Sequence, residues 1–295
     1  ISLREVKYSN DELAQMPDEG TTTKDSRTTL LGVIAAKEAW RSAGSPSLGD
    51  GKTGVFSGNT VGGMDLTEHF YAEFMNDANA GDISAMRTHE CADSTECIAD
   101  SLGATGMVST ISTACSSSAN SIMLGARMIK HGWLDRAIVG GVDALTKFTV
   151  NGFSVLQILD EQYSQPFDQN RRGLNLGEGA GFLVLESEDT AKKEHILAEL
   201  VGYANSNDAY HQTASSPDGT GAYLAMKGAI EVAGIAPEAV DYINVHGTGT
   251  SNNDLSEGIA IQRIFGEKIP KFSSTKAFTG HTLGASGGIE AVFAV

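Results

Sequence analysis

Strand-like and helix-like segments alternate along this chain, and this alternation restricts its fold more than any other feature. Short runs rich in β-branched residues end at glycine turns and are followed by stretches with helical spacing. The pattern predicts an α/β protein with buried sheets. Strands are expected at 52–60, 107–114, 135–145, 179–187, 196–206, 240–250 and the start of 271–288, and helices at 31–44, 84–106, 116–132 and 221–234, with a last helix near the C-terminus.

A charged stretch, "EDTAKKEH" at 188–195, is the best candidate for a boundary between two parts of the chain. The order of elements restarts after it, which predicts an N-terminal part at 1–190 and a C-terminal part at 191–295. The chain has no initiator methionine, and its last residues, 287–295, break off in an apolar helical pattern without a cap. We therefore expect a piece of a longer protein, incomplete at both termini.

Net charge and cysteine content restrict the expected partners and location of the protein. The 295 residues carry a formal net charge of −16, which argues against nucleic acid as the main partner. Three cysteines are an odd number and too few for a disulfide framework, so a cytoplasmic location is expected. No apolar run is long enough to cross a bilayer, and the first residues do not resemble a signal peptide. We expect no membrane insertion.

The stretch "STISTACSSSANSIML", 109–124, places Cys115 where a strand gives way to a helix. Unpaired N–H groups and the helix dipole favour a thiolate at such a position, and small neighbours leave room for a substrate. Strand, sharp turn and helix would form a nucleophile elbow. On this stretch alone, a buried cysteine acting as a small hydrophobic residue is an equal alternative.

Two histidines lie in glycine-flanked loops that follow predicted strands. His246 stands in "NVHGTGT", and His281 follows Lys276 by five residues in "SSTKAFTGHTLGASGG". Ligand sites of open α/β folds lie beyond the carboxyl ends of strands. Either loop alone could hold an ordinary solvated or locally bonded side chain, but together with Cys115 they point to a catalytic site.

Four motifs together resemble one family. "TACSSSAN", "VHGTGT", "SSTKAFTGHTLGASGG" and "FDQNRRGLNLGEGAGFLVLE" are similar to the β-ketoacyl-acyl carrier protein synthases, the Cys-His-His branch of the thiolase-fold condensing enzymes. The resemblance covers essentially the whole chain. It implies a thiolase-like layered α/β/α/β/α fold with two related halves. The activity it implies is decarboxylative Claisen condensation of an acyl thioester with malonyl-acyl carrier protein, in fatty acid, polyketide or polyene biosynthesis.

The resemblance also implies roles for individual residues. Cys115 matches the nucleophile that accepts the acyl group, and His246 and His281 match the pair that binds the malonyl carbonyl and promotes decarboxylation. Lys276 and Glu290 match residues that support this network. A nearby lysine would help to keep a histidine neutral, and two neutral imidazoles could donate hydrogen bonds to an enolate oxygen.

The remaining implied contacts concern substrate and partner. Thr248 and Thr250 match threonines that contact the phosphopantetheine arm, and Phe153 falls where relatives place an aromatic gate to the acyl pocket. Lys24 and Arg27 fall where the family offers basic contacts to the acidic carrier protein. The family implies a homodimer. It needs no metal and no redox cofactor, because its substrates are carried on the phosphopantetheine of the acyl carrier protein.

Two other classes of function stay open beside this one. A chain-length-factor-like partner subunit would resemble these synthases without catalysing, although such subunits normally lose the nucleophile. A cysteine hydrolase would share Cys115 and one histidine. The chain also departs from the usual family pattern at Arg172 and Leu174, and lacks an opening strand and closing strands with a "GFGG"-like loop.

Overall fold

The computed structural model describes residues 2–16, 20–49, 51–211 and 213–295. The chain forms two compact units, each assembled from separate stretches. One unit contains residues 1–4, 156–176 and 198–281, and the other contains 5–155, 177–197 and 282–295. The expected division between residues 190 and 191 stays a prediction.

The larger unit is built around a four-stranded sheet with the order β3-β2-β4-β6. Its strands are β2 (Thr53–Gly58), β3 (Val108–Ile111), β4 (Arg136–Asp143) and β6 (Gly179–Glu186). β2 runs parallel to both β3 and β4, whereas β6 is antiparallel to β4. Each strand lies within a stretch predicted from the sequence, so these four predictions are confirmed.

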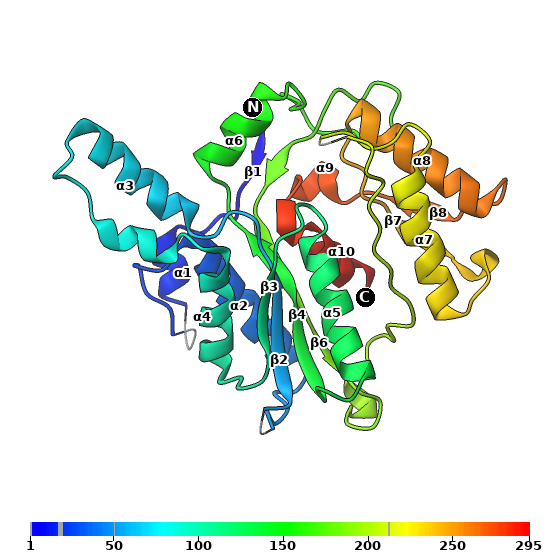
Figure 1. Ribbon diagram of the computed structural model, residues 1–295, viewed down its shortest axis with the longest axis horizontal. Helices are drawn as coiled ribbons and strands as arrows, with labels where there is room; N and C mark the ends of the chain where they lie inside the picture. The colour runs from blue at the N-terminus through cyan, green and yellow to red at the C-terminus, as the bar shows by residue number, and fades with distance from the viewer. Residues whose placement is uncertain (1, 17–19, 50, 212) are drawn as a thin grey trace. The chain divides into compact units, whose positions relative to one another are not determined.

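Helices cover both faces of this sheet (Figure 1). α2 (Arg27–Ser42) and α4 (Cys91–Leu102) contact each other and the sheet, as do α5 (Ser117–Lys130) and α10 (Ser286–Ala294). The result is a helix–sheet–helix sandwich in which the central strands β2 and β4 are buried on both sides.

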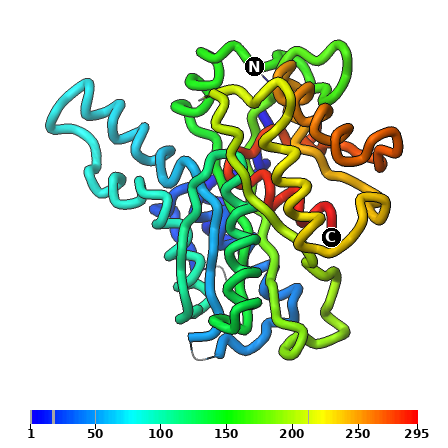
Figure 2. Tube along the Cα trace, turned by 45° about the vertical axis from the view of Figure 1, so that its right-hand side comes forward, coloured from blue at the N-terminus to red at the C-terminus, as the bar shows by residue number. Residues whose placement is uncertain are grey.

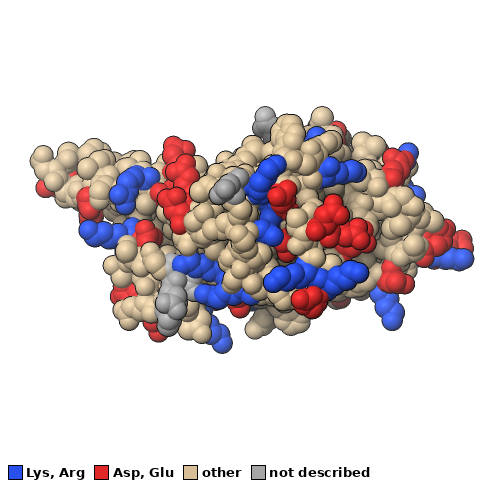
Figure 3. Space-filling model, turned by 90° about the horizontal axis from the view of Figure 1, so that it is seen from below, with Lys and Arg blue, Asp and Glu red and all other residues tan. Residues whose placement is uncertain are grey.

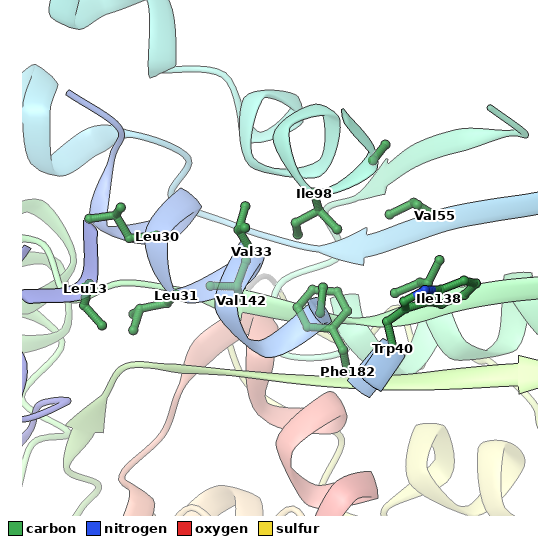
Figure 4. Close-up of a cluster of buried hydrophobic side chains, with 12 residues drawn as sticks. Leu13, Leu30, Leu31, Val33, Trp40, Val55, Ile98, Ile138, Val142 and Phe182 are labelled. Carbon is green, nitrogen blue, oxygen red and sulfur yellow. The ribbon is translucent and has the colours of Figure 1, made fainter. Parts of the chain in front are cut away.

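Side chains along β2 and β4 point alternately to the two faces of the sheet, so each face has its own hydrophobic cluster. Val55 and Ile138 belong to the cluster formed with α2 and α4 (Figure 4). Their neighbours Phe56 and Val139 belong to a second cluster with Met128 of α5. Successive side chains of a strand point to opposite faces, so a continuous apolar run is what this double covering requires. Burial of each large apolar side chain contributes about 1.5–3 kcal/mol.

The smaller unit places two parallel strands side by side. β7 (Tyr242–Asn244) pairs with β8 (Lys271–Ser273). His246 and Lys276 follow these strands closely. Because the carboxyl ends of parallel strands lie at the same edge, the two loops are brought together there. α7 (Thr220–Ala233) and α8 (Ser251–Phe265) pack against each other in the same unit.

The remaining elements are short or lie outside the sheet. They are β1 (Leu3–Arg4), α1 (Asn10–Ala14), α3 (Met64–Asn76), η1 (Ile83–Thr88), α6 (Lys147–Val155), β5 (Leu176–Gly177), η2 (Lys193–His195), η3 (Pro237–Ala239), α9 (Lys276–Thr279) and η4 (Leu283–Ala285). In Figure 2 the hairpin of α3 and η1 stands away from the sheet. Among the described residues, no helix is long and apolar enough to cross a membrane.

Two predictions about secondary structure are wrong. The single helix expected at 84–106 is divided into η1 and α4, because the N–H of Gly63 donates to the carbonyl of Thr88 (2.7 Å) and takes an acceptor that a continuous helix would use. The strand expected at 196–206 is not formed. No described strand pairs with it, and Leu197 is 76% exposed.

Candidate active site

Cys115 lies in the turn between β3 and α5, in the larger unit. Ser117 holds this turn: the N–H of Thr113 donates to its Oγ (2.9 Å), and that hydroxyl donates to the carbonyl of Ala114 (2.6 Å). Ala114 has a positive φ of 54°, a left-handed conformation that is rare outside glycine. The nucleophile candidate therefore stands, half-buried, at a sharp and strained turn before a helix.

A glycine makes the close approach of this helix possible. A side chain at Gly58, the last residue of β2, would place its Cβ 2.3 Å from the backbone nitrogen of Ser118. Only glycine lets the first turn of α5 rest on the end of β2. The small residues around Cys115 thus have a structural reason as well as the chemical one expected from the sequence.

In the smaller unit, the carboxylate of Glu257 fixes the loop that carries His246. The backbone N–H of His246 donates to one carboxylate oxygen (2.7 Å), and that of Gly247 donates to the other (2.9 Å). Burial raises the pKa of Glu257, and these two hydrogen bonds oppose the increase. Glu257 was not among the residues predicted from the sequence. Its position on α8, eleven residues after His246, carried no recognisable signal by itself.

The two histidines lie against each other and next to a buried lysine. The imidazole rings of His246 and His281 are perpendicular, with centroids 5.2 Å apart and an interplanar angle of 87°. Lys276 is 2% exposed, and its Nζ lies 3.2 Å from Nδ1 of His246. An ammonium group can only donate, so Nδ1 of His246 accepts and Nε2 carries the proton.

This environment keeps both rings neutral. Burial is the main cause that lowers the pKa of His281, to about 3, and the charge of Lys276 adds to it. The pKa of His246 is lowered well below its ordinary value by burial, then by Lys276 and His281. Both imidazole rings are therefore neutral at neutral pH.

The backbone of His281 is held by a second loop of the same unit. Its N–H donates to the carbonyl of Asn175 (2.7 Å). Asn175 is 1% exposed, and its side chain accepts a bond from the N–H of Ser164 and donates to the carbonyls of Asp160 and Gln162. Because the buried side-chain amide of Asn175 makes hydrogen bonds through both its oxygen and its nitrogen, it fixes the loop that binds the backbone of His281.

The predicted threonines line the loop after His246. The hydroxyls of Thr248 and Thr250 lie 2.9 Å apart, and the carbonyl of Thr248 accepts a bond from Ser164. Thr248 is buried and Thr250 is half-buried. Their contact with a phosphopantetheine arm stays a prediction.

Other predicted residues are placed as follows. Phe153 is half-buried in α6, and Glu290 is half-buried in α10. Lys24 is exposed. Arg27, by contrast, is taken up by internal bonds, chiefly to both carboxylate oxygens of Glu178. These bonds disfavour the predicted contact of Arg27 with a carrier protein.

Comparison with known proteins agrees with these features. Residues 2–191 match the family described as Beta-ketoacyl synthase, N-terminal domain, and residues 197–295 match Beta-ketoacyl synthase, C-terminal domain. The 3-oxoacyl-[acyl-carrier-protein] synthase 2 of Staphylococcus aureus is 39% identical over 293 residues, which cover 94% of this chain and 70% of that protein. The Vibrio cholerae protein of the same name is 36% identical, over 83% of this chain and 62% of its own length.

Solved structures show the same likeness. The ishigamide ketosynthase/chain length factor matches with a TM-score of 0.88 and 30% identity, over 98% of this chain and 72% of that one. A ketosynthase solved in complex with its chain length factor, from Xenorhabdus doucetiae, matches with a TM-score of 0.84 and 34% identity, over 99% and 71%. The likeness confirms the predicted α/β fold of the thiolase-like class. The chain belongs to the β-ketoacyl synthase family.

Proposed function

We propose that this ketosynthase catalyses the decarboxylative Claisen condensation of an acyl thioester with malonyl-acyl carrier protein. The observation that carries the proposal is the pair of neutral, perpendicular imidazoles beside the ammonium group of Lys276. An enolate needs hydrogen-bond donors aimed at its oxygen, and neutral imidazole N–H groups donate without protonating the carbanion.

In the first step, the sulfur of Cys115 attacks the carbonyl carbon of an acyl thioester. The acyl group moves to Cys115, and the thiol of the phosphopantetheine arm leaves. The turn at Ala114 places Cys115 just before the start of α5, where helix N–H groups lack intrahelical partners. A thiolate serves as nucleophile here and as leaving group in the later step.

In the second step, the malonyl thioester binds with its carbonyl oxygen at the imidazoles of His246 and His281. The bond between its α-carbon and its carboxylate breaks, CO2 leaves, and the electron pair forms an enolate. The α-carbon then attacks acyl-Cys115, a carbon–carbon bond forms, and the thiolate of Cys115 is released. The chain grows by two carbons, and the chemistry requires no metal or redox cofactor.

Within the larger unit, the C-terminal segment 282–295 packs on the helix that follows Cys115. The N–H of Gly288 donates to Oγ of Ser118 (2.8 Å). A Cβ at Gly284 would lie 3.3 Å from the Cβ of Ser117.

The acyl carrier protein is the proposed partner. Thr248 and Thr250 would contact the phosphopantetheine arm, Phe153 would border the acyl pocket, and Glu290 would support Lys276. Exposed Lys24 would meet the acidic carrier, since only a local basic surface can steer it to a chain of net charge −16. Figure 3 shows lysine and arginine side chains interspersed with acidic ones at the surface. We further propose a homodimer in the cytoplasm.

The test uses purified acyl- and malonyl-acyl carrier protein thioesters. Acylation of Cys115 is followed by mass spectrometry, and CO2 release and β-ketoacyl product are followed in parallel. Cys115→Ala should abolish acylation and condensation. Cys91→Ala is the matched control, because Cys91 is also half-buried but lies in α4, and it should leave both unchanged.

Other outcomes would favour the alternative classes. Acylation followed only by free acid would indicate a hydrolase. Neither acylation nor CO2 release from the wild type would favour a non-catalytic, chain-length-factor-like subunit. Normal condensation by Cys115→Ala would refute the assigned nucleophile.

A further inference from the structure

A fully buried carboxylate at the end of β4 takes no part in the chemistry proposed above. Asp143 is 0% exposed and accepts four hydrogen bonds. Its Oδ1 accepts from the backbone N–H groups of Thr60 (2.9 Å) and Val61 (3.1 Å). Its Oδ2 accepts from the hydroxyl of Thr60 (2.6 Å) and from the N–H of Gly284 (2.6 Å). One carboxylate therefore ties the turn after β2 to the turn at the start of η4.

The second of these turns follows His281 directly and is strained. Leu283, two residues after His281, has a positive φ of 52° and is 5% exposed. A leucine persists in this conformation only where its surroundings hold it. The N–H that Asp143 binds belongs to Gly284, the peptide that immediately follows the strained residue. The carboxylate is thus bonded at the point where the turn would otherwise relax.

The space around this bond is closed. A Cβ at Gly284 would lie 2.8 Å from Oδ2 of Asp143, 3.0 Å from Cγ2 of Thr60 and 3.3 Å from the Cβ of Ser117. Three segments therefore meet at one glycine, and the turn has no room to shift while the carboxylate stays in place.

The carboxylate is ionised at neutral pH. Burial raises the pKa of Asp143 to about 6, and the hydrogen bonds from Thr60, Gly284 and Val61 oppose the increase. Among the described residues, the thiol of Cys91 in α4 interacts electrostatically with it, and the pKa of Cys91 is raised by burial and by the charge of Asp143. Asp143 is the acceptor in all four of its hydrogen bonds, as an ionised carboxylate, which has no proton to donate, must be.

We propose that Asp143 is a positioning residue for His281: by holding the Leu283–Gly284 turn, it fixes the ring where decarboxylation requires it. The inference rests on the proposed function, because His281 must be a catalytic residue for its placement to matter. Asp143 itself touches neither substrate nor reacting atoms. Its loss should impair the step that depends on the histidines more than the acylation of Cys115.

The test compares two buried carboxylates. In Asp143→Asn, the amide NH2 replaces one of the two acceptor oxygens and, in either orientation, faces at least one backbone N–H donor, so the four accepted hydrogen bonds cannot all be kept. Glu178→Gln is the matched control, because Glu178 is 7% exposed and accepts from the N–H groups of Val6 and Leu145, away from this turn. For each variant, CO2 release from malonyl-acyl carrier protein and acylation of Cys115 are measured separately, with thermal melting as a check on folding.

Asp143→Asn should lower kcat for decarboxylation at least tenfold, leave KM within about threefold, and change the acylation rate less than threefold. Glu178→Gln should lower the melting temperature without changing the ratio of the two rates. If Asp143→Asn lowers both rates in proportion, which is the effect of simply having less folded protein, the inference is refuted. If the wild type releases no CO2, the proposed function fails instead.

A milder variant covers the case in which Asp143→Asn does not fold. Thr60→Val removes only the hydroxyl that donates to Oδ2, the oxygen that also binds Gly284. It should lower kcat for decarboxylation about threefold with acylation unchanged. Equal acylation and equal decarboxylation in Thr60→Val and wild type would then refute the positioning role.

Discussion

Replacing Lys276 with methionine tests two roles of this side chain: its hydrogen bond to His246 and its effect on the pKa of both histidines. Methionine has a similar length and fits an apolar pocket, but it carries no charge and cannot donate a hydrogen bond. The variant therefore loses the bond from Nζ to Nδ1 of His246, 3.2 Å long in the wild type. It also loses the charge that helps to lower the pKa of both histidines.

The size of each effect follows from the structure. Burial, the larger cause, remains, so the pKa of His281 should rise from about 3 but stay below its ordinary value of 6.5. At pH 7 a pKa of 6.5 leaves about a quarter of each ring protonated, so protonation of the two rings together lowers activity at most about 1.7-fold. A hydrogen bond to a charged group contributes about 1.5–3 kcal/mol. Its loss at His246 should lower decarboxylation about 10- to 100-fold.

The assay is the pH dependence of CO2 release, together with NMR titration of the histidine ring signals. If the lost bond dominates, raising the pH to 8.5 should not restore the activity of Lys276→Met. Lys271→Met is the matched control, because Lys271 is an exposed lysine in β8 and its loss removes the same charge. Full rescue at high pH, or a histidine pKa above 6.5 in Lys276→Met, would refute the reasoning.

Three further results are expected. Arg27→Ala should cost about 3–5 kcal/mol of unfolding free energy, measured by urea denaturation, since it leaves the buried carboxylate of Glu178 without its cation; an unchanged midpoint would contradict this. Cys97 should react with iodoacetamide at pH 7.5 far more slowly than Cys115, because burial raises the pKa of Cys97 to about 11; peptide mapping that found Cys97 labelled first would contradict this. Decarboxylation should fall by half near pH 6 as Asp143 is protonated, and this acidic limb should be missing from the profile of Asp143→Asn.

The sheet of the larger unit could be predicted because its central strands are buried on both faces. A continuous run without polar side chains, such as 137–142, indicates a buried strand, and this run lies within β4. The strand expected at 196–206 shows the limit of such reasoning. Its pattern is that of a strand, but a strand also needs a neighbour, and neighbours are set by distant parts of the chain. The division of 84–106 likewise depends on Gly63, twenty residues upstream.

The candidate catalytic residues could be predicted from their motifs, whereas the residues that hold them in place could not. His246, His281 and Lys276 stand in recognisable loops, and the structure brings these three together. Glu257 and Asp143 act through backbone N–H groups, whose partners leave no pattern in a single sequence. A sequence shows which side chains can react, but the groups that hold them become visible only in three dimensions.

The interleaving of the two units has a consequence for synthesis of the chain. The larger unit needs residues 282–295, which the ribosome makes only after 198–281. About 100 residues separate the end of β6 from the start of α10, so at roughly 5–20 residues per second the sheet waits about 5–20 s for this helix. During that interval the face destined for α10 is open to water and to chaperones, and an early stop in translation would leave it bare.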